Sequence, residues 1–164
     1  MQDDETVAAF HAALKQDDPT GIRGGLAKLD DEWRGFFAGL VAGMGAMACL
    51  TQLLEEGLDP NTRDDGDVSM LERACEFGQL AVAKKLLSAG ATIDGIPLVF
   101  AAQGGSLDCV KLLLDHGAQP DQGYPGFPSA LGFAETDGLT AIAEELRRRG
   151  ARSLVGLGEE PPKQ

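Results

Sequence analysis

The stretch IPLVFAAQGGSLDCVKLLLDHGAQPD, residues 96–121, decides the fold. It holds two apolar segments separated by glycines at 104–105, and Gly117 follows the second segment. In the second segment, apolar residues recur as pairs at 109–110 and 113–114, which is typical of the buried face of an amphipathic helix. A glycine directly after such a helix favours a left-handed terminal residue. We therefore expect two helices here, joined by a tight turn.

The same pattern occurs four times along the chain, and glycines mark each copy. Each copy contains two glycines 12 positions apart: Gly45 and Gly57, Gly78 and Gly90, Gly105 and Gly117, Gly138 and Gly150. The first glycines of successive copies are separated by 33, 27 and 33 residues. A shorter apolar segment precedes every copy. These intervals predict four helix pairs in a repeat architecture.

Helix pairs on this period resemble the ankyrin repeat. The family pattern TPLHxAA…G…VxxLLxxGA is matched best by residues 96–121 and nearly as well by SMLERACEFGQLAVAKKLLSAGATID, residues 69–94. The resemblance covers about residues 36–152. It implies an all-α fold, an ankyrin-repeat solenoid of stacked antiparallel helix pairs with short finger loops.

The repeats depart from the family pattern in two ways. The family's histidine is replaced by Glu72, Val99 and Gly132, so its hydrogen-bond bracing is expected to be missing and apolar stacking to supply more of the stability. Glu72 needs another partner or exposure to water. The short connection ATIDG, in the 27-residue interval, predicts a notch between longer fingers at residues 58–68 and 118–128.

We expect three parts in the chain. Residues 1–35 are expected to form an N-terminal capping helix pair, a degenerate repeat. Four ankyrin-like repeats are expected over residues 36–152, and a flexible tail over residues 153–164. Trp33, Phe36 and Phe37 are expected to pack between the cap and the first repeat.

Composition excludes several functions. Among 164 residues, 26 acidic and 14 basic side chains give a net charge of −12, which disfavours binding to nucleic acid or to an anionic membrane. The acidic N-terminus is unlike a signal peptide, and no apolar run is long enough to span a membrane. We expect a cytoplasmic monomer whose cysteines, Cys49, Cys75 and Cys109, are buried and reduced.

The sequence holds no recognisable catalytic motif. His11 and His116 are the two histidines, and no cysteine cluster completes a metal site with them. The stretch GIRGGLAK, residues 21–28, lacks the spacing of a phosphate-binding loop. We therefore expect a protein that is not an enzyme and that binds neither a cofactor nor a metal.

The family resemblance implies binding of another protein through the concave face and the finger loops. Variable positions of the family fall, among others, on Met44, Arg63, Asp65, Glu76, Phe77, Gln103, Tyr124, Phe127, Thr136 and Asp137. Residues 55–137 hold 14 acidic and 5 basic side chains, a net charge of −9 that would either steer a basic partner or serve solubility alone. Two alternatives stay open: a small acidic immunity or inhibitor protein that neutralises a basic toxin or nuclease, and a scaffold that tethers an enzyme complex.

Overall fold

The computed structural model describes residues 4–94, 96–121 and 128–152. Within these residues the regular elements are helices, and no β-strand occurs beyond an isolated antiparallel bridge between Arg63 and Ser69. The α-helices are α1 (Asp4–Gln16), α2 (Asp31–Met44), α3 (Met47–Glu55), α4 (Met70–Glu76), α5 (Leu80–Ser88), α6 (Pro97–Gln103), α7 (Leu107–Asp115), α8 (Ala130–Thr136) and α9 (Thr140–Arg148). Two 3-10 helices, η1 (Pro19–Ile22) and η2 (Leu26–Lys28), lie between α1 and α2.

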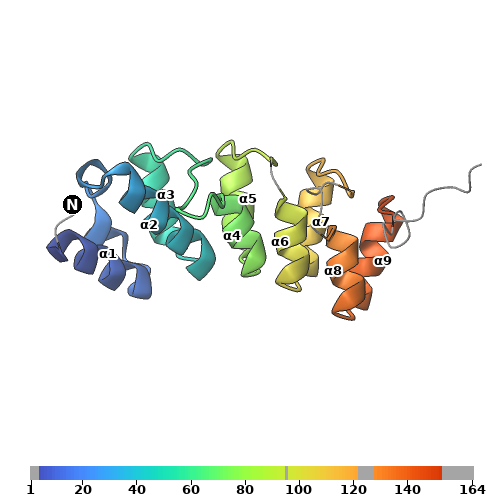
Figure 1. Cartoon of the computed structure of the whole chain (residues 1–164). Coiled ribbons are helices and arrows are strands. Elements are labelled where there is room, and N and C mark those ends of the chain that lie inside the picture. Colours follow the sequence, from blue (N-terminus) through green and yellow to red (C-terminus); the bar gives the residue numbers. More distant parts are fainter. Residues whose placement is uncertain (1–3, 95, 122–127, 153–164) are drawn as a thin grey trace, which may run out of the picture.

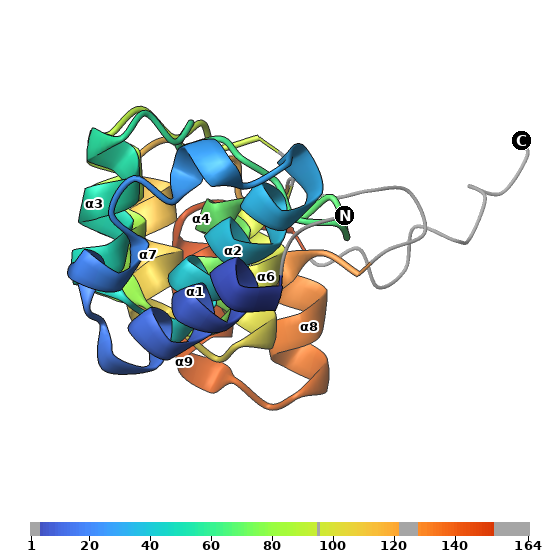
Figure 2. The ribbon, with the colours of Figure 1, turned by 90° about the vertical axis from the view of Figure 1, so that its left-hand side faces the viewer.

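The helices form antiparallel pairs that stand side by side in one row. Figure 1 shows α1 at one end of this row and α9 at the other. The first helices of the pairs, α2, α4, α6 and α8, pack against one another, and the second helices, α3, α5, α7 and α9, form a parallel layer behind them (Figure 2). The predicted all-α solenoid of stacked helix pairs is therefore confirmed.

The backbone conformation at the paired positions explains why glycine occupies them. All eight adopt a positive φ, between 66° and 99°. At the end of α2, for example, Gly45 has a φ of 76°, and its N–H donates to the Val41 carbonyl oxygen. Because L-residues with a side chain rarely take this conformation, glycine recurs wherever a helix of a pair ends.

A continuous apolar core runs between the two layers of helices. One leucine of each second helix lies eight positions after the first glycine of its repeat and is at most 2% exposed: Leu53, Leu86, Leu113 and Leu146. Burying each such side chain contributes about 1.5–3 kcal/mol. The repeated interval thus places equivalent leucines in a single stack.

The N-terminal end of the row is closed by aromatic packing. The rings of Phe10 and Phe37 lie 4.7 Å apart between their centroids, and both side chains are buried. Trp33 and Phe36 are half-buried beside them, as expected, whereas His11 is exposed and its ring is steeply inclined to those of Phe36 and Phe37, at 90° and 67°. Helix α2 begins at Asp31, so it runs across the expected start of the first repeat at residue 36.

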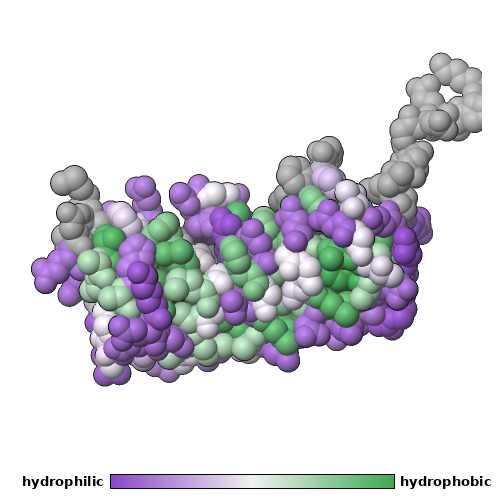
Figure 3. Space-filling view, turned by 90° about the horizontal axis from the view of Figure 1, so that it is seen from below, coloured by the Kyte–Doolittle hydropathy of each residue, from purple (hydrophilic) through white to green (hydrophobic). Residues whose placement is uncertain are grey.

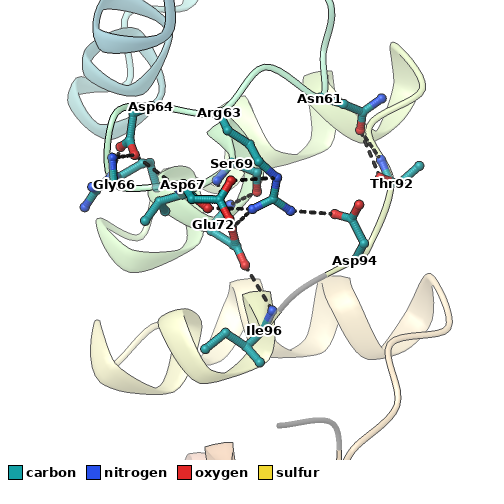
Figure 4. A network of polar contacts seen from close by, with 12 residues as sticks. Asn61, Arg63, Asp64, Gly66, Asp67, Ser69, Glu72, Thr92, Asp94 and Ile96 are labelled. Atoms are coloured by element: carbon teal, nitrogen blue, oxygen red, sulfur yellow. Dashed lines mark hydrogen bonds and ion pairs between the residues drawn. The ribbon is translucent and has the colours of Figure 1, made fainter. Parts of the chain in front are cut away.

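The most informative polar contacts surround Glu72, whose side chain is only 3% exposed (Figure 4). Its Oε2 accepts a hydrogen bond from the Ser69 N–H at 2.8 Å, and its Oε1 accepts one from the Ile96 N–H at 3.0 Å. The Arg63 guanidinium lies 3.5 Å from Oε2. The expectation that polar bracing is missing is therefore wrong at this repeat, because the carboxylate joins the start of α4 to the start of the next repeat.

Two further contacts join the same pair of repeats. Arg63 Nη2 lies 3.2 Å from a carboxylate oxygen of Asp94, and Asn61 Oδ1 accepts a hydrogen bond from the Thr92 N–H at 2.8 Å (Figure 4). The first finger loop, residues 58–68, is thus tied to the short connection that follows α5. At the later repeats the family's histidine is replaced by Val99, which is buried, and by Gly132.

Replacing Glu72 should destabilise the fold strongly. In Glu72→Gln the amide group cannot accept two N–H donors and an arginine at once, so at least one buried donor loses its partner. We expect a loss of about 1–3 kcal/mol in the free energy of unfolding, measured by urea denaturation. The matched variant Glu55→Gln, at an exposed position of α3, should stay within about 0.5 kcal/mol of the parent. Equal midpoints for the two variants would contradict the bracing role.

Candidate functional site

A groove of about 420 Å³ lies between α2 and α4, beside the first finger loop. We call it the α2–α4 groove. It is lined by Phe36, Gly39, Leu40, Gly43, Met44, Asp64, Asp65, Arg73 and Phe77. Helix α2 supplies one wall, α4 and the residue after it supply the other, and the finger loop closes one end. The groove therefore combines residues from two neighbouring repeats.

Two glycines of α2, one turn apart, allow the groove walls to approach each other. A Cβ atom at Gly39 would lie 3.3 Å from Cβ of Asp64, and a Cβ atom at Gly43 would lie 3.1 Å from the Phe77 ring. Glycine inside a helix costs roughly 1 kcal/mol relative to alanine. Two such glycines on one helix face are thus a sequence signal for close packing, which the sequence analysis did not use.

One end of the groove is apolar and exposed to water. Phe77 is 58% exposed and Met44 is 47% exposed, the two large hydrophobic side chains that stand out as exposed among the described residues. Met44 is the last residue of α2, and Phe77 directly follows α4. Each therefore lies near the turn that leads to the second helix of its pair. Seen from below the row, hydrophobic residues lie in patches separated by hydrophilic ones (Figure 3). The apolar end of the groove therefore leaves two large side chains largely uncovered.

The other end of the groove is acidic and partly fixed by ion pairs. Asp64 Oδ2 accepts a hydrogen bond from Arg73 Nε at 2.7 Å, and Asp64 Oδ1 accepts from the N–H groups of Gly66 and Val68, both at 3.0 Å. Burial opposes the charge on Arg73, but its bonds to Asp64 and Glu76 outweigh burial and raise its pKa. Asp65 is exposed, and within the described part of the chain no hydrogen bond or ion pair holds its carboxylate.

The structure brings together some of the predicted site residues. Met44, Asp65 and Phe77 line the α2–α4 groove, and Glu76 borders it through its ion pair with Arg73 at 3.0 Å. Figure 4 shows the Arg63 guanidinium directed at Glu72 and Asp94, and Arg63 is not among the residues that line this groove. Asp64, Arg73 and Leu40 line the groove, although the sequence analysis did not propose them.

Other predicted residues lie elsewhere. Gln103, at the end of α6, and Thr136 and Asp137, at the end of α8, are exposed farther along the row. Tyr124 and Phe127 lie outside the described residues. A second hollow, of about 340 Å³, lies between α4 and α6 where the short connection predicts a notch, and Arg63, Glu72, Ile96 and Phe100 are among its lining residues.

A row of antiparallel helix pairs, with finger loops beside its first helices, defines a helical repeat solenoid. The family model described as ankyrin repeat matches residues 96–123. The ankyrin repeat domain of human ASB11, a solved structure, aligns with a TM-score of 0.64 and 30% identity over 70% of this chain and 54% of that one. The chain is an ankyrin repeat protein.

Several curated proteins are similar over about two thirds of the chain. The palmitoyltransferase Hip14 of Drosophila melanogaster is 30% identical over 66% of this chain and 17% of its own length. The B-cell lymphoma 3 protein homolog of Mus musculus is 35% identical over 65% and 26%, and the zygote-specific protein 3 of Chlamydomonas reinhardtii is 34% identical over 70% and 32%. The chain thus spans at most about a third of the length of these relatives.

The ankyrin repeat fold indicates a general class of function. Ankyrin repeats generally mediate protein–protein interaction, and the fold is typically a non-enzymatic module. None of the described helices is long and apolar enough to cross a membrane. The described residues also contain no group of three or more histidine, cysteine or acidic side chains placed to hold a metal ion.

Two of the three thiols, those of Cys49 and Cys75, are poorly suited to nucleophilic chemistry. All three cysteines are free and buried, as the sequence predicts. Burial raises the pKa of the Cys49 thiol to about 12, and the neighbouring Asp17 carboxylate adds to this rise. A hydrogen bond with Cys109, together with burial, also raises the pKa of Cys75. At neutral pH Cys49 and Cys75 therefore stay protonated.

Alkylation should reveal this protection. At pH 8 we expect iodoacetamide to modify Cys49 of the folded protein at least about a hundredfold more slowly than Cys49 of the chain unfolded in urea, because both access and the thiolate fraction are reduced. Mass spectrometry of timed samples measures the two rates at each cysteine. Comparable rates in the folded and unfolded protein would contradict the burial and the raised pKa.

Proposed function

We propose that this protein binds a partner protein through the α2–α4 groove and the adjoining face of the first helices, and that it does so without catalysing a reaction. One observation carries the proposal. A single groove is lined at one end by two exposed large apolar side chains, Met44 and Phe77, and at the other end by the exposed carboxylate of Asp65. Such a pairing of apolar anchors with a polar edge is typical of protein-binding surfaces.

The energetics favour covering the apolar end. Full burial of a methionine or phenylalanine contributes about 1.5–3 kcal/mol, and roughly half of each side chain is still exposed at Met44 and Phe77. A partner that covers both would gain on the order of 2 kcal/mol from this contact alone. Further contacts along α6 and α8, where Gln103, Thr136 and Asp137 are exposed, would extend the interface.

The protein's acidity favours one particular role within this function. The net charge of −9 over residues 55–137 supports a basic partner, such as a toxin or nuclease that an immunity or inhibitor protein would neutralise. A scaffold for an enzyme complex would use the same groove but would not need this charge. Buried free thiols support a reducing compartment such as the cytoplasm, and we propose that the protein acts there as a monomer.

Truncating the apolar end should weaken partner binding while the fold is kept. The double variant Met44→Ala, Phe77→Ala should bind at least about tenfold more weakly, because buried aromatic and methionine anchors dominate interface energies. Affinity capture from an extract of the source organism, followed by titration of each captured protein, measures the change.

The matched control is Met47→Ala, which removes the same side chain from α3 on the other layer and should leave binding within about threefold. Urea unfolding of all three proteins separates loss of binding from loss of fold. If the double variant retains every captured protein with parental affinity, the groove is not the binding surface.

A further inference from the structure

We infer that the α2–α4 groove receives a partner segment in which a basic side chain, arginine or lysine, lies about 12 Å from a large apolar side chain, a spacing taken from the helix rise along α2. This inference rests on the proposed protein-binding function and names the chemistry of the segment that fills the groove. It follows from the charge at one end of the groove, the apolar surface at the other, and the length of α2 between them.

The acidic end can hold a cation. Beyond the finger end of the groove, a small hollow of about 90 Å³ is lined by Glu32, Trp33, Phe36 and Asp65. Both carboxylates are exposed, and within the described residues no hydrogen bond or ion pair holds either of them. Carboxylates beside aromatic rings suit a guanidinium or an ammonium group, which gains ion pairs and cation–π contacts together.

The single guanidinium that lines the groove does not cancel this preference. Arg73 is held by Asp64 at 2.7 Å and by Glu76 at 3.0 Å, so two carboxylates already surround its charge. Counting Glu32 and Asp65, four carboxylates face one arginine along the groove and its edge. The remaining negative field attracts a basic group and repels an acidic segment.

The apolar end sets the second requirement and the spacing. Phe36 and Met44 lie eight positions apart on α2, which corresponds to about 12 Å along the helix axis. An extended segment covers this distance in about four residues. We therefore expect the basic residue and the apolar residue of such a segment to be about four positions apart, with the apolar residue over Met44 and Phe77.

A second copy of this chain does not fit the groove as well. The two arginines most exposed on α9, Arg147 and Arg148, are engaged by Glu135 at 2.8 Å and Glu145 at 2.6 Å. Two copies would also bring together net charges of −12 each. The field of the groove thus favours a foreign basic segment.

Selection from a phage-displayed library of random 12-residue peptides against the full chain tests the inference. Enriched peptides are synthesised and titrated by calorimetry at low and at high salt. We expect them to combine arginine or lysine with a large apolar residue about four positions away, and to bind more weakly as salt rises.

Two pairs of variants with equal charge change show where the basic residue binds. Glu32→Gln with Asp65→Asn should weaken binding of the enriched peptides at least about tenfold and remove most of the salt dependence. Glu55→Gln with Asp108→Asn, which neutralises two exposed acids on α3 and α7, should change binding less than about threefold.

The outcomes separate this inference from the proposed function. Enriched peptides without a basic residue, or equal binding to the Glu32→Gln, Asp65→Asn variant and the parent, would overturn the inference. If the enriched peptides in either case still lose affinity for the Met44→Ala, Phe77→Ala variant, the groove remains the binding surface. If no peptide is enriched, both the inference and the proposed function fail. Both also fail if no enriched peptide depends on Glu32 and Asp65 or on Met44 and Phe77.

Discussion

The buried carboxylate of Glu72 is the constraint on which the middle of the solenoid depends. A charge that is 3% exposed is tolerated only when donors surround it, and here the donors come from three places: the start of α4, the finger loop and the start of the next repeat. Satisfying Glu72 therefore fixes the positions of Ser69, Arg63 and Ile96 relative to one another. Apolar stacking alone has no such directional requirement.

The shape of the candidate site follows from this constraint. Glu72 and Asp94 hold the Arg63 guanidinium, and the next residue along the chain, Asp64, turns the other way to accept from Arg73. The finger loop is thereby anchored on both sides of α4, which leaves the exposed Asp65 at the edge of the α2–α4 groove. The bracing that joins two repeats thus also positions the acidic end of the proposed binding surface.

Much of the fold is predictable from the sequence because its signals are local. Glycines at intervals of 33, 27 and 33 residues mark helix ends that need a positive φ, and the apolar pairs between them mark one buried face. The role of Glu72 is not local, since its acceptor oxygens meet donors 9 and 24 positions away. The same is true of the groove: exposure of Met44 and Phe77 follows from their places at helix ends, whereas the approach of Asp64 to Gly39 depends on the path of the whole finger.

Hydrogen exchange of the Ile96 amide, followed by NMR, tests the central claim most directly. If Glu72 joins the two repeats, Glu72→Gln should speed exchange of the Ile96 amide at least about tenfold, which corresponds to about 1.4 kcal/mol, and to a greater extent than exchange at amides inside α9. Glu55→Gln should leave the Ile96 amide unchanged. Equal protection of the Ile96 amide in the parent and in Glu72→Gln would contradict the account.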